Sequence, residues 1–140
     1  MADYYGKTRT NYFSVTDEAK FRQIIASCGA TDELVLHEEK LDDGNIQYMF
    51  YCEGSILGLP DKDDDADYDY DAFCIALQQV LPDGDAILIT TIGWEKIRYF
   101  VANCDVVTNR EFKSIDLQRE AVKLAGVLLG NPDYATRMDY

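Results

Sequence analysis

Twice along this chain, an amphipathic helix pattern is followed by short β-strand patterns. The first helix has its apolar face over residues 21–28, behind the N-cap candidate Asp17, and Gly29 is expected to end it. The second has its apolar face over residues 73–81, behind the N-cap candidate Asp71. Helices interspersed with strands on short turns predict an α+β fold, an antiparallel sheet with helices packed on one face.

The remaining elements are expected from alternation and turn residues. Asp43-Gly44 is a strong hairpin signal, and Gly93 is expected to turn the chain between two later strands. The strands are expected over residues 7–15, 34–36, 46–52, 55–59, 86–91, 97–102 and 105–108. A third helix is expected from Asp116 to Leu129, stopped by Gly130. Its apolar residues at helical spacing predict a buried stripe of Leu117, Ala121, Leu124 and Leu128.

The two helix-and-strand units are offset by a nearly constant distance. Phe21 and Phe73 lie 52 residues apart, as do Cys52 and Cys104. A duplication, giving two α-β-β-β repeats, and chance similarity both explain this offset. The length of 140 residues predicts one domain over residues 1–140, with residues 61–71 as an acidic loop or edge strand.

The charge balance restricts the partners of the chain. There are 26 acidic and 13 basic side chains, so the formal net charge is -13. Residues 61–71 hold seven acids and one base, Lys62, and therefore carry about half of that excess. Such a charge disfavours direct contact with nucleic acid or an anionic membrane, and favours basic protein surfaces.

The acidic segment does not match a calcium loop. An EF-hand loop needs Gly at its sixth position and Glu at its twelfth, and a loop starting at Asp65 has Tyr70 and Ala76 there. Loops starting at Asp61 or Asp63 place Ala72 or Cys74 at the twelfth position. We therefore expect no EF-hand and no resident metal or cofactor, while the test leaves a looser divalent-ion site open.

The spacing of the carboxylates suggests a second use of the segment. Asp65, Asp67, Asp69 and Asp71 recur every second residue. In an extended strand they would form a row on one face, spaced roughly 6.5–7 Å, comparable with phosphates along a nucleic-acid strand. The candidate partner-binding residues are Asp63, Asp64, Asp65, Asp67, Asp69 and Asp71. The competing interpretation is a solvated loop in which Asp69 and Asp71 serve the N-terminus of the following helix.

Catalytic patterns are missing from the sequence. His37, the single histidine, follows a strand pattern and enters a polar turn, which favours a surface position. The four cysteines form no C-x-x-C pair and are expected to be reduced thiols. Phosphate-binding and nucleophile-elbow motifs do not occur. We therefore expect a non-enzymatic protein.

A few basic residues offer an alternative site. Arg9, Arg98 and Arg137 could together contact an anion, which would make the protein a binder of a small anionic ligand or a nucleotide signal. No apolar stretch approaches 18 residues and the N-terminus is polar, so a cytoplasmic location is expected. The sequence is also compatible with a homodimer.

Three stretches together resemble a known group of proteins. They are residues 8–15, Thr-Arg-Thr-Asn-Tyr-Phe-Ser-Val, residues 94–99, Trp-Glu-Lys-Ile-Arg-Tyr, and residues 136–140, Thr-Arg-Met-Asp-Tyr. They are similar to small acidic proteins encoded on plasmids, phages and other mobile elements. The group has no assigned activity, so no catalytic residues carry over. The resemblance implies a context, because mobile elements carry small acidic proteins that block host defence, including anti-CRISPR and anti-restriction inhibitors. Together with the charge and the carboxylate spacing, this leads us to expect a non-enzymatic inhibitor that mimics DNA and blocks a nucleic-acid-binding host protein, a defence nuclease.

Overall fold

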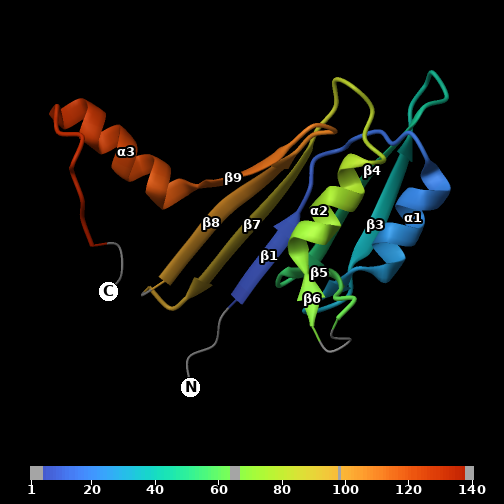
Figure 1. Ribbon diagram of the computed structural model, residues 1–140, viewed down its shortest axis with the longest axis horizontal. Coiled ribbons are helices and arrows are strands. Elements are labelled where there is room, and N and C mark those ends of the chain that lie inside the picture. Colours follow the sequence, from blue (N-terminus) through green and yellow to red (C-terminus); the bar gives the residue numbers. More distant parts are fainter. Residues whose placement is uncertain (1–4, 64–66, 98, 138–140) are drawn as a thin grey trace.

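The structure is a computed structural model that describes residues 5–63, 67–97 and 99–137. It is a mixed α+β fold with a six-stranded antiparallel sheet, a small three-stranded sheet and three helices (Figure 1). The helices are α1 (Glu18–Ser27), α2 (Tyr70–Gln78) and α3 (Leu117–Leu129). The strands are β1 (Tyr5–Arg9), β2 (Gly29–Ala30), β3 (Val35–Lys40), β4 (Ile46–Glu53), β5 (Ile56–Pro60), β6 (Tyr68–Asp69), β7 (Ile87–Glu95), β8 (Tyr99–Val107) and β9 (Phe112–Asp116).

The first strand lies in the middle of the large sheet. The strand order is β3-β4-β1-β7-β8-β9, so β1 pairs with β4 on one side and β7 on the other. In this register Lys7 lies opposite both Glu53 and Ile92, and Tyr5 lies opposite Trp94. The N-terminal strand therefore joins the two hairpins, β3-β4 and β7-β8, into one sheet.

Helices α1 and α2 cover one face of this sheet and enclose the core (Figure 1). Aromatic rings meet at its centre, where Phe50 contacts Phe13 and Phe73 edge-on, with ring centroids 6.0 Å apart in both pairs. Thr8, the buried polar residue on β1, donates its hydroxyl to the Gly54 carbonyl at 2.8 Å. Its hydrogen-bonding capacity is thus used inside the protein, as burial requires.

All three helices begin at an aspartate. Asp17, Asp69 and Asp116 are extended residues whose carboxylates accept a hydrogen bond from the backbone N–H three residues later, at 2.9–3.0 Å. Asp17 and Asp116 confirm the predicted starts. Asp71, the expected cap of α2, is instead in its first turn, because Asp69 ends β6 in the extended conformation that a cap needs.

The later strands differ from the sequence expectation in length. Gly93 does not turn the chain, because β7 continues through it to Glu95, with Gly93 paired to Gly6 and Val101. The turn lies after β7, where Lys96 has a positive φ of 52°. The segments expected over 97–102 and 105–108 are one strand, β8, and β9 was not expected. In the other hairpin, Gly44 has φ 91° in the turn between β3 and β4, which confirms the Asp43-Gly44 signal.

The two proposed repeat units have different places in the sheet. In the first unit the second long strand, β4, lies beside β1, whereas in the second unit the first long strand, β7, does so. Cys52 is buried and Cys104 is half-buried. The matched positions therefore have different environments, and the strand order does not support a repeat.

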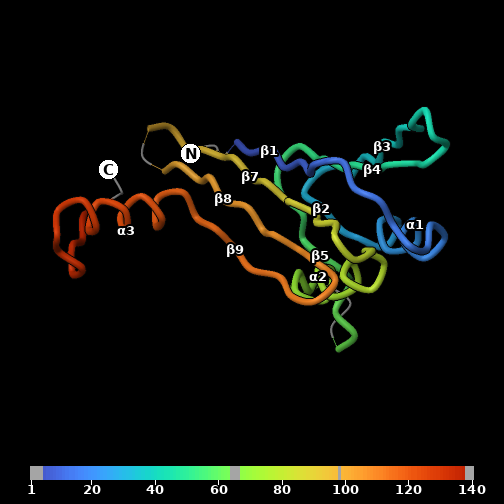
Figure 2. The backbone as a smooth tube through the Cα atoms, turned by 90° about the horizontal axis from the view of Figure 1, so that it is seen from above, coloured from blue at the N-terminus to red at the C-terminus, as the bar shows by residue number. Residues whose placement is uncertain are grey.

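Helix α3 departs furthest from the prediction. It begins directly after β9 and leads away from the large sheet (Figures 1 and 2). Leu117, Leu124 and Leu128, expected to be buried, are all exposed, and within α3 burial is confined to Gly126. The stripe prediction was wrong because no part of the described chain packs over this side of the helix. Within the described residues, no helix is long and apolar enough to cross a membrane.

Candidate binding surfaces

Of the acidic segment, the described residues 61–63 and Asp67 lie at the tip of the hairpin between β5 and β6, residues 68–69 form β6, and residues 70–71 begin α2. The two ends of the tip are joined where the Asp61 N–H donates to the Asp67 carbonyl at 3.0 Å. The Asp63 N–H donates to Asp61 Oδ1 at 2.9 Å and tightens the turn. Figure 2 shows this part of the chain projecting from the body of the molecule. The candidate residues Asp64 and Asp65 lie outside the described residues.

The extended row of four carboxylates is not formed. Asp67 is followed by the short strand β6, in which Asp69 pairs with Leu59. At Tyr70 the backbone enters α2, so Asp71 follows helical rather than extended geometry. The helix needs acceptors for its first N–H groups, and Asp69 supplies one. The period of two therefore ends at Asp69.

The base of the hairpin is closely packed against the domain. Gly58 on β5 has φ 118°, and a Cβ there would lie 2.4 Å from the Asp69 carbonyl oxygen. A Cβ on Gly29 would lie 2.3 Å from the ring of Tyr68. The Tyr70 hydroxyl donates to Asp105 Oδ2 at 2.5 Å. The tip is thus held on a base that has little room to shift.

Among the described residues, the ion pairs of the protein do not use the acidic segment. The carboxylates in those ion pairs belong to Glu18, Glu38, Glu53, Glu111 and Glu120. The side-chain carboxylates of Asp63, Asp67 and Asp71 accept no hydrogen bond from the described part of the chain. Their charge is therefore available to a partner.

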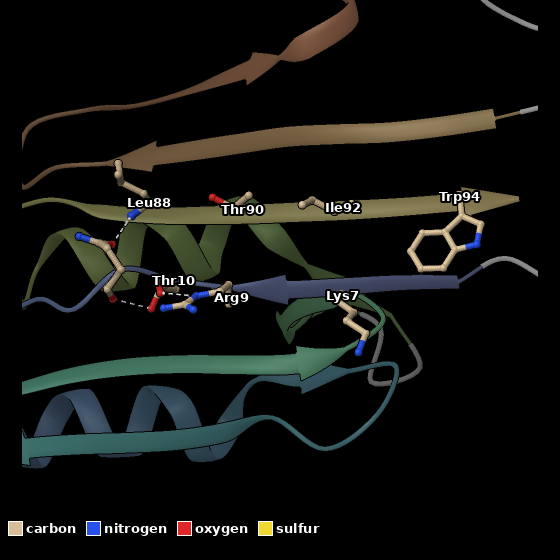
Figure 3. Close-up of a pocket in the computed structure, with 8 residues that line it drawn as sticks. Lys7, Arg9, Thr10, Leu88, Thr90, Ile92 and Trp94 are labelled. Carbon is tan, nitrogen blue, oxygen red and sulfur yellow. Dashed lines mark hydrogen bonds between the residues drawn. The ribbon is translucent and has the colours of Figure 1, made fainter. Parts of the chain in front are cut away.

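A second surface is the face of the large sheet opposite α1 and α2. On β7 the residues Ile87 and Ile89 are in the core, and the alternating residues Leu88, Thr90, Ile92 and Trp94 point the other way. With β1 they form a groove of about 460 Å³ (Figure 3). The groove is lined by Lys7, Arg9, Thr10, Asn11, Leu88, Thr90, Ile92 and Trp94. We call this side of the sheet the open face.

The groove combines an apolar wall with two cations. Asn11 is fixed at one end, where it donates to the Ala86 carbonyl at 3.0 Å and accepts from the Leu88 N–H at 2.8 Å. Arg9 donates from Nε to the Thr10 carbonyl at 3.3 Å, and Lys7 Nζ lies 3.3 Å from Glu53. Trp94 stacks on Tyr5, with ring centroids 5.9 Å apart. Such a groove can hold an apolar segment or an aromatic anion.

The three-arginine site is not assembled around Arg9. Arg98 lies outside the described residues, and Arg137 belongs to the segment that follows α3, which Figure 1 shows apart from β1. The cation that does share the groove with Arg9 is Lys7, which the sequence analysis missed. The sequence did indicate this pairing, because the side chains of residues 7 and 9 in a strand point to the same face.

Two of the four cysteine thiols, Cys28 and Cys74, are in surroundings that disfavour the thiolate. All four cysteines are free, and Cys52 and Cys74 are buried. Burial raises the pKa of both the Cys28 and the Cys74 thiol from 9.0 to about 12. Both thiols are therefore protonated at neutral pH, whereas a nucleophilic cysteine needs a lowered pKa.

The single histidine lies on the surface. His37 is exposed, as expected, and its ring meets that of Tyr12 edge-on at 6.2 Å. In the described part of the chain, no three His, Cys, Asp or Glu side chains are grouped closely enough to hold a metal ion.

Comparison of this chain with protein-family models, curated proteins and solved structures gives no match.

Proposed function

We propose that this chain is a non-enzymatic binding protein of the cytoplasm whose acidic hairpin engages the basic surface of a nucleic-acid-binding host protein. The proposal rests on one observation. The hairpin tip presents Asp61, Asp63 and Asp67 on a loop closed by the hydrogen bond between Asp61 and Asp67, apart from the described ion pairs of the protein.

The electrostatics support an inhibitor that occupies a nucleic-acid site. A basic channel that binds phosphates attracts any dense group of negative charge, and the chain carries a net charge of -13. Asp69 lies in the extended strand β6, but its carboxylate caps α2, so the described residues form no regular row of free carboxylates. We therefore attribute recognition to charge density at the tip. The partner expected for such a surface is a defence nuclease, of the kind blocked by anti-CRISPR or anti-restriction proteins.

Anchoring of the hairpin favours binding as well. A loop that is already ordered loses less conformational entropy when it binds than a free segment does. Gly58 and Tyr70 hold the base through backbone packing and the hydrogen bond to Asp105. The base of the hairpin is thus fixed to the domain.

A charge-matched pair of variants tests the proposal. The test variant carries Asp63→Asn, Asp67→Asn and Asp71→Asn, which remove three charges and no described hydrogen bond. The control carries Glu39→Gln, Asp42→Asn and Asp133→Asn, three exposed acids outside the segment. The captured host protein is identified from a lysate, purified, and titrated against each variant at two salt concentrations.

We expect the test variant to bind at least about tenfold more weakly and with a smaller salt dependence, while the control binds like wild type. Equal losses in the two variants would mean that net charge, and not the hairpin, is recognised. Unchanged binding by the test variant would contradict the proposal.

The groove on the open face favours one other function, binding of a small anionic ligand. Lys7 and Arg9 would contact the anion, and Trp94 offers a ring for stacking. Trp94 is the one tryptophan of the chain, so its emission reports directly on the groove. Saturable quenching by nucleotides that is lost in Arg9→Gln would support this function, and an unchanged spectrum would reject it.

A further inference from the structure

Helix α3 exposes an apolar stripe that is unusual for a protein surface. Its large apolar residues, Leu117, Leu124, Val127, Leu128 and Leu129, are each between 57% and 77% exposed. Residues 124–129 contain no charged or polar side chain. Apolar surface of this extent on a helix normally lies against another element or a partner.

The opposite side of α3 is already covered by its own C-terminal turn. The Asn131 N–H donates to the Gly126 carbonyl at 2.9 Å, and a Cβ on Gly126 would lie 3.8 Å from Tyr134 Cβ. Leu117, Leu124 and Leu128 fall on the far side of the helix from Gly126, at helical spacing. The uncovered stripe is thus made of Leu117, Leu124 and Leu128 on one side of the helix, and Val127 and Leu129 lie outside it.

The open face of the sheet carries a second apolar surface. Leu88, Ile92, Trp94, Phe100 and Ile115 are between 38% and 57% exposed. They come from neighbouring strands, because Trp94 pairs with Phe100, and Cys104 pairs with Ile115. Helices α1 and α2 lie on the other face, and of α3 the residues that border this face are Leu117 and Glu120 at its start.

The two apolar surfaces adjoin each other. A groove of about 290 Å³ is lined by Ile92, Ala102, Cys104 and Ile115 of the sheet together with Leu117 at the start of α3. Leu117 also begins the stripe, so the stripe and the open face lie on the same side of the molecule. The helix nevertheless leads away from the sheet, beyond the end of the β7-β8 hairpin (Figure 2).

The stripe cannot cover the sheet of its own chain without a change at the junction. Asp116 is both the last residue of β9 and the N-cap of α3, so no linker separates strand and helix. Its carboxylate accepts from the Arg119 N–H at 2.9 Å and holds this junction. Reversing the helix would break the cap.

From this arrangement we infer that two copies of the chain form a symmetric dimer in which α3 of each copy packs on the open face of the other. The same two surfaces are used by both copies, as a two-fold axis requires. In this dimer the stripe and the open face of each copy are both covered. A different partner bound to only one of these surfaces would leave the second surface exposed to water. The inference goes beyond the proposed function and does not depend on it.

The apolar area is sufficient for a stable dimer. Eight large apolar side chains make up the stripe and the open face, and at roughly 200 Å² for a fully exposed side chain they expose about 900 Å² per chain. A standard protein interface buries about 800 Å² per partner. A dimer in which each α3 packs on the other copy would therefore bury an area typical of a specific interface.

The charges of the two surfaces allow this contact between two acidic chains. Helix α3 carries Arg119, Glu120 and Lys123, and is one of the less acidic parts of the chain. The groove is bordered by Lys7 and Arg9. The acidic hairpin belongs to the small sheet, outside both surfaces. Like-charge repulsion is therefore weak where the copies would meet.

The test measures the mass in solution and the environment of Trp94 together. Light scattering during size-exclusion chromatography should give twice the chain mass, and dilution should yield monomer. Trp94 emission should shift to shorter wavelength as the dimer forms, since the partner's α3 would cover it. A monomer at every concentration up to the hundred-micromolar range would overturn the inference. So would Trp94 emission that is already shifted in the monomer, because α3 would then lie on its own sheet.

Two variants and one control localise the interface. Leu128→Glu on α3 and Ile92→Glu on the open face should each raise the dimer dissociation constant at least about tenfold. Ile75→Glu places the same charge at an exposed apolar position on α2 and should dimerise like wild type. Circular dichroism confirms that each variant is folded.

Mixing the two variants tests the exchange itself. A dimer of Leu128→Glu with Ile92→Glu keeps one undamaged contact, between the wild-type α3 of one chain and the wild-type sheet of the other. The mixture should therefore form more dimer than either variant alone. Failure of the mixture to exceed them would overturn the pairing of helix with sheet.

Discussion

The Tyr70 hydroxyl donates a hydrogen bond to Asp105 Oδ2, which ties the first residue of α2 to the middle of β8. Asp105 accepts a second hydrogen bond at Oδ1 from the Ser114 hydroxyl on β9. One carboxylate therefore connects a helix and two strands. Because Tyr70 also follows the acidic hairpin, the same hydrogen bond positions the hairpin base against the large sheet.

Replacing this tyrosine should weaken both the fold and the hairpin base. Tyr70→Phe keeps the ring but leaves Asp105 Oδ2 without its donor, so we expect a loss of about 2 kcal/mol in the free energy of unfolding. Tyr51→Phe, at an exposed tyrosine of β4, is the control and should change it by less than about 0.5 kcal/mol. Urea denaturation of the three proteins measures the difference, and equal values would contradict the role given to Asp105.

Gly58 should not tolerate a side chain. Alanine there combines an unfavourable positive φ of 118° with a Cβ 2.4 Å from the Asp69 carbonyl oxygen. We expect Gly58→Ala to cost more than about 2 kcal/mol. Gly44→Ala is the matched control, since φ is 91° and no described atom lies within 4 Å of the added Cβ. It should cost about 1 kcal/mol from backbone strain alone. Thermal denaturation showing equal costs would contradict the close approach of β5 and β6.

Two substitutions of Asp69, the N-cap of α2, distinguish its role as a hydrogen-bond acceptor from the effect of its charge. Asp69→Ala removes the acceptor for the Ala72 N–H and should cost about 1 kcal/mol. Asp69→Asn keeps an acceptor and should cost only a few tenths of that, while it removes the charge. If the asparagine variant unfolds as easily in urea as the alanine variant, the carboxylate contributes through charge and not through capping.

Alkaline pH should destabilise the protein through its buried thiols. The pKa of Cys74 is raised from 9.0 to about 12, chiefly by burial and also by the nearby Asp105. Between these values the unfolded thiol loses its proton and the folded thiol keeps it, so stability falls as the pH rises from about 9 to 12. In Cys74→Ala this part of the decline should disappear. Val80→Ala, another buried residue, controls for lost core volume.

Urea midpoints between pH 8 and pH 11 measure this slope. Burial also raises the pKa of Tyr70 above its ordinary value, and its hydrogen bond to Asp105 acts in the same direction, so Tyr70→Phe should flatten the decline above pH 10. Parallel slopes for wild type and Cys74→Ala would show that the Cys74 thiol ionises equally in both states.

The local signals in the sequence predicted most of the elements. Asp17 and Asp116 cap the helices where expected, Gly130 ends α3 with φ 67°, and Phe21 and Phe73 are buried. These features depend on a few neighbouring residues, and so they are readable from spacing. The turn predicted at Gly93 was wrong because glycine is also compatible with a continuous β-strand. The strand β9 was missed because its residues show no clear alternation of apolar and polar side chains.

The candidate sites were predicted less completely. The sequence marked the acidic segment, but where extended backbone gives way to helix depends on which aspartate meets the first N–H groups of α2. The sequence also marked Arg9, but its pairing with Lys7 and Trp94 across two strands required the sheet. Contacts between distant strands leave no signal in the spacing of nearby residues.

By itself, the sequence determined the helix positions, the turn at Asp43-Gly44, the charge of the acidic segment and the apolar stripe of α3, because each follows from residues close together in the chain. Only the tertiary structure decided that β1 joins the two hairpins, that one face of the sheet stays open, and that the stripe beginning at Leu117 is exposed. The physical reason is that periodicity shows which side of an element avoids water, whereas the packing of the whole chain determines what covers that side.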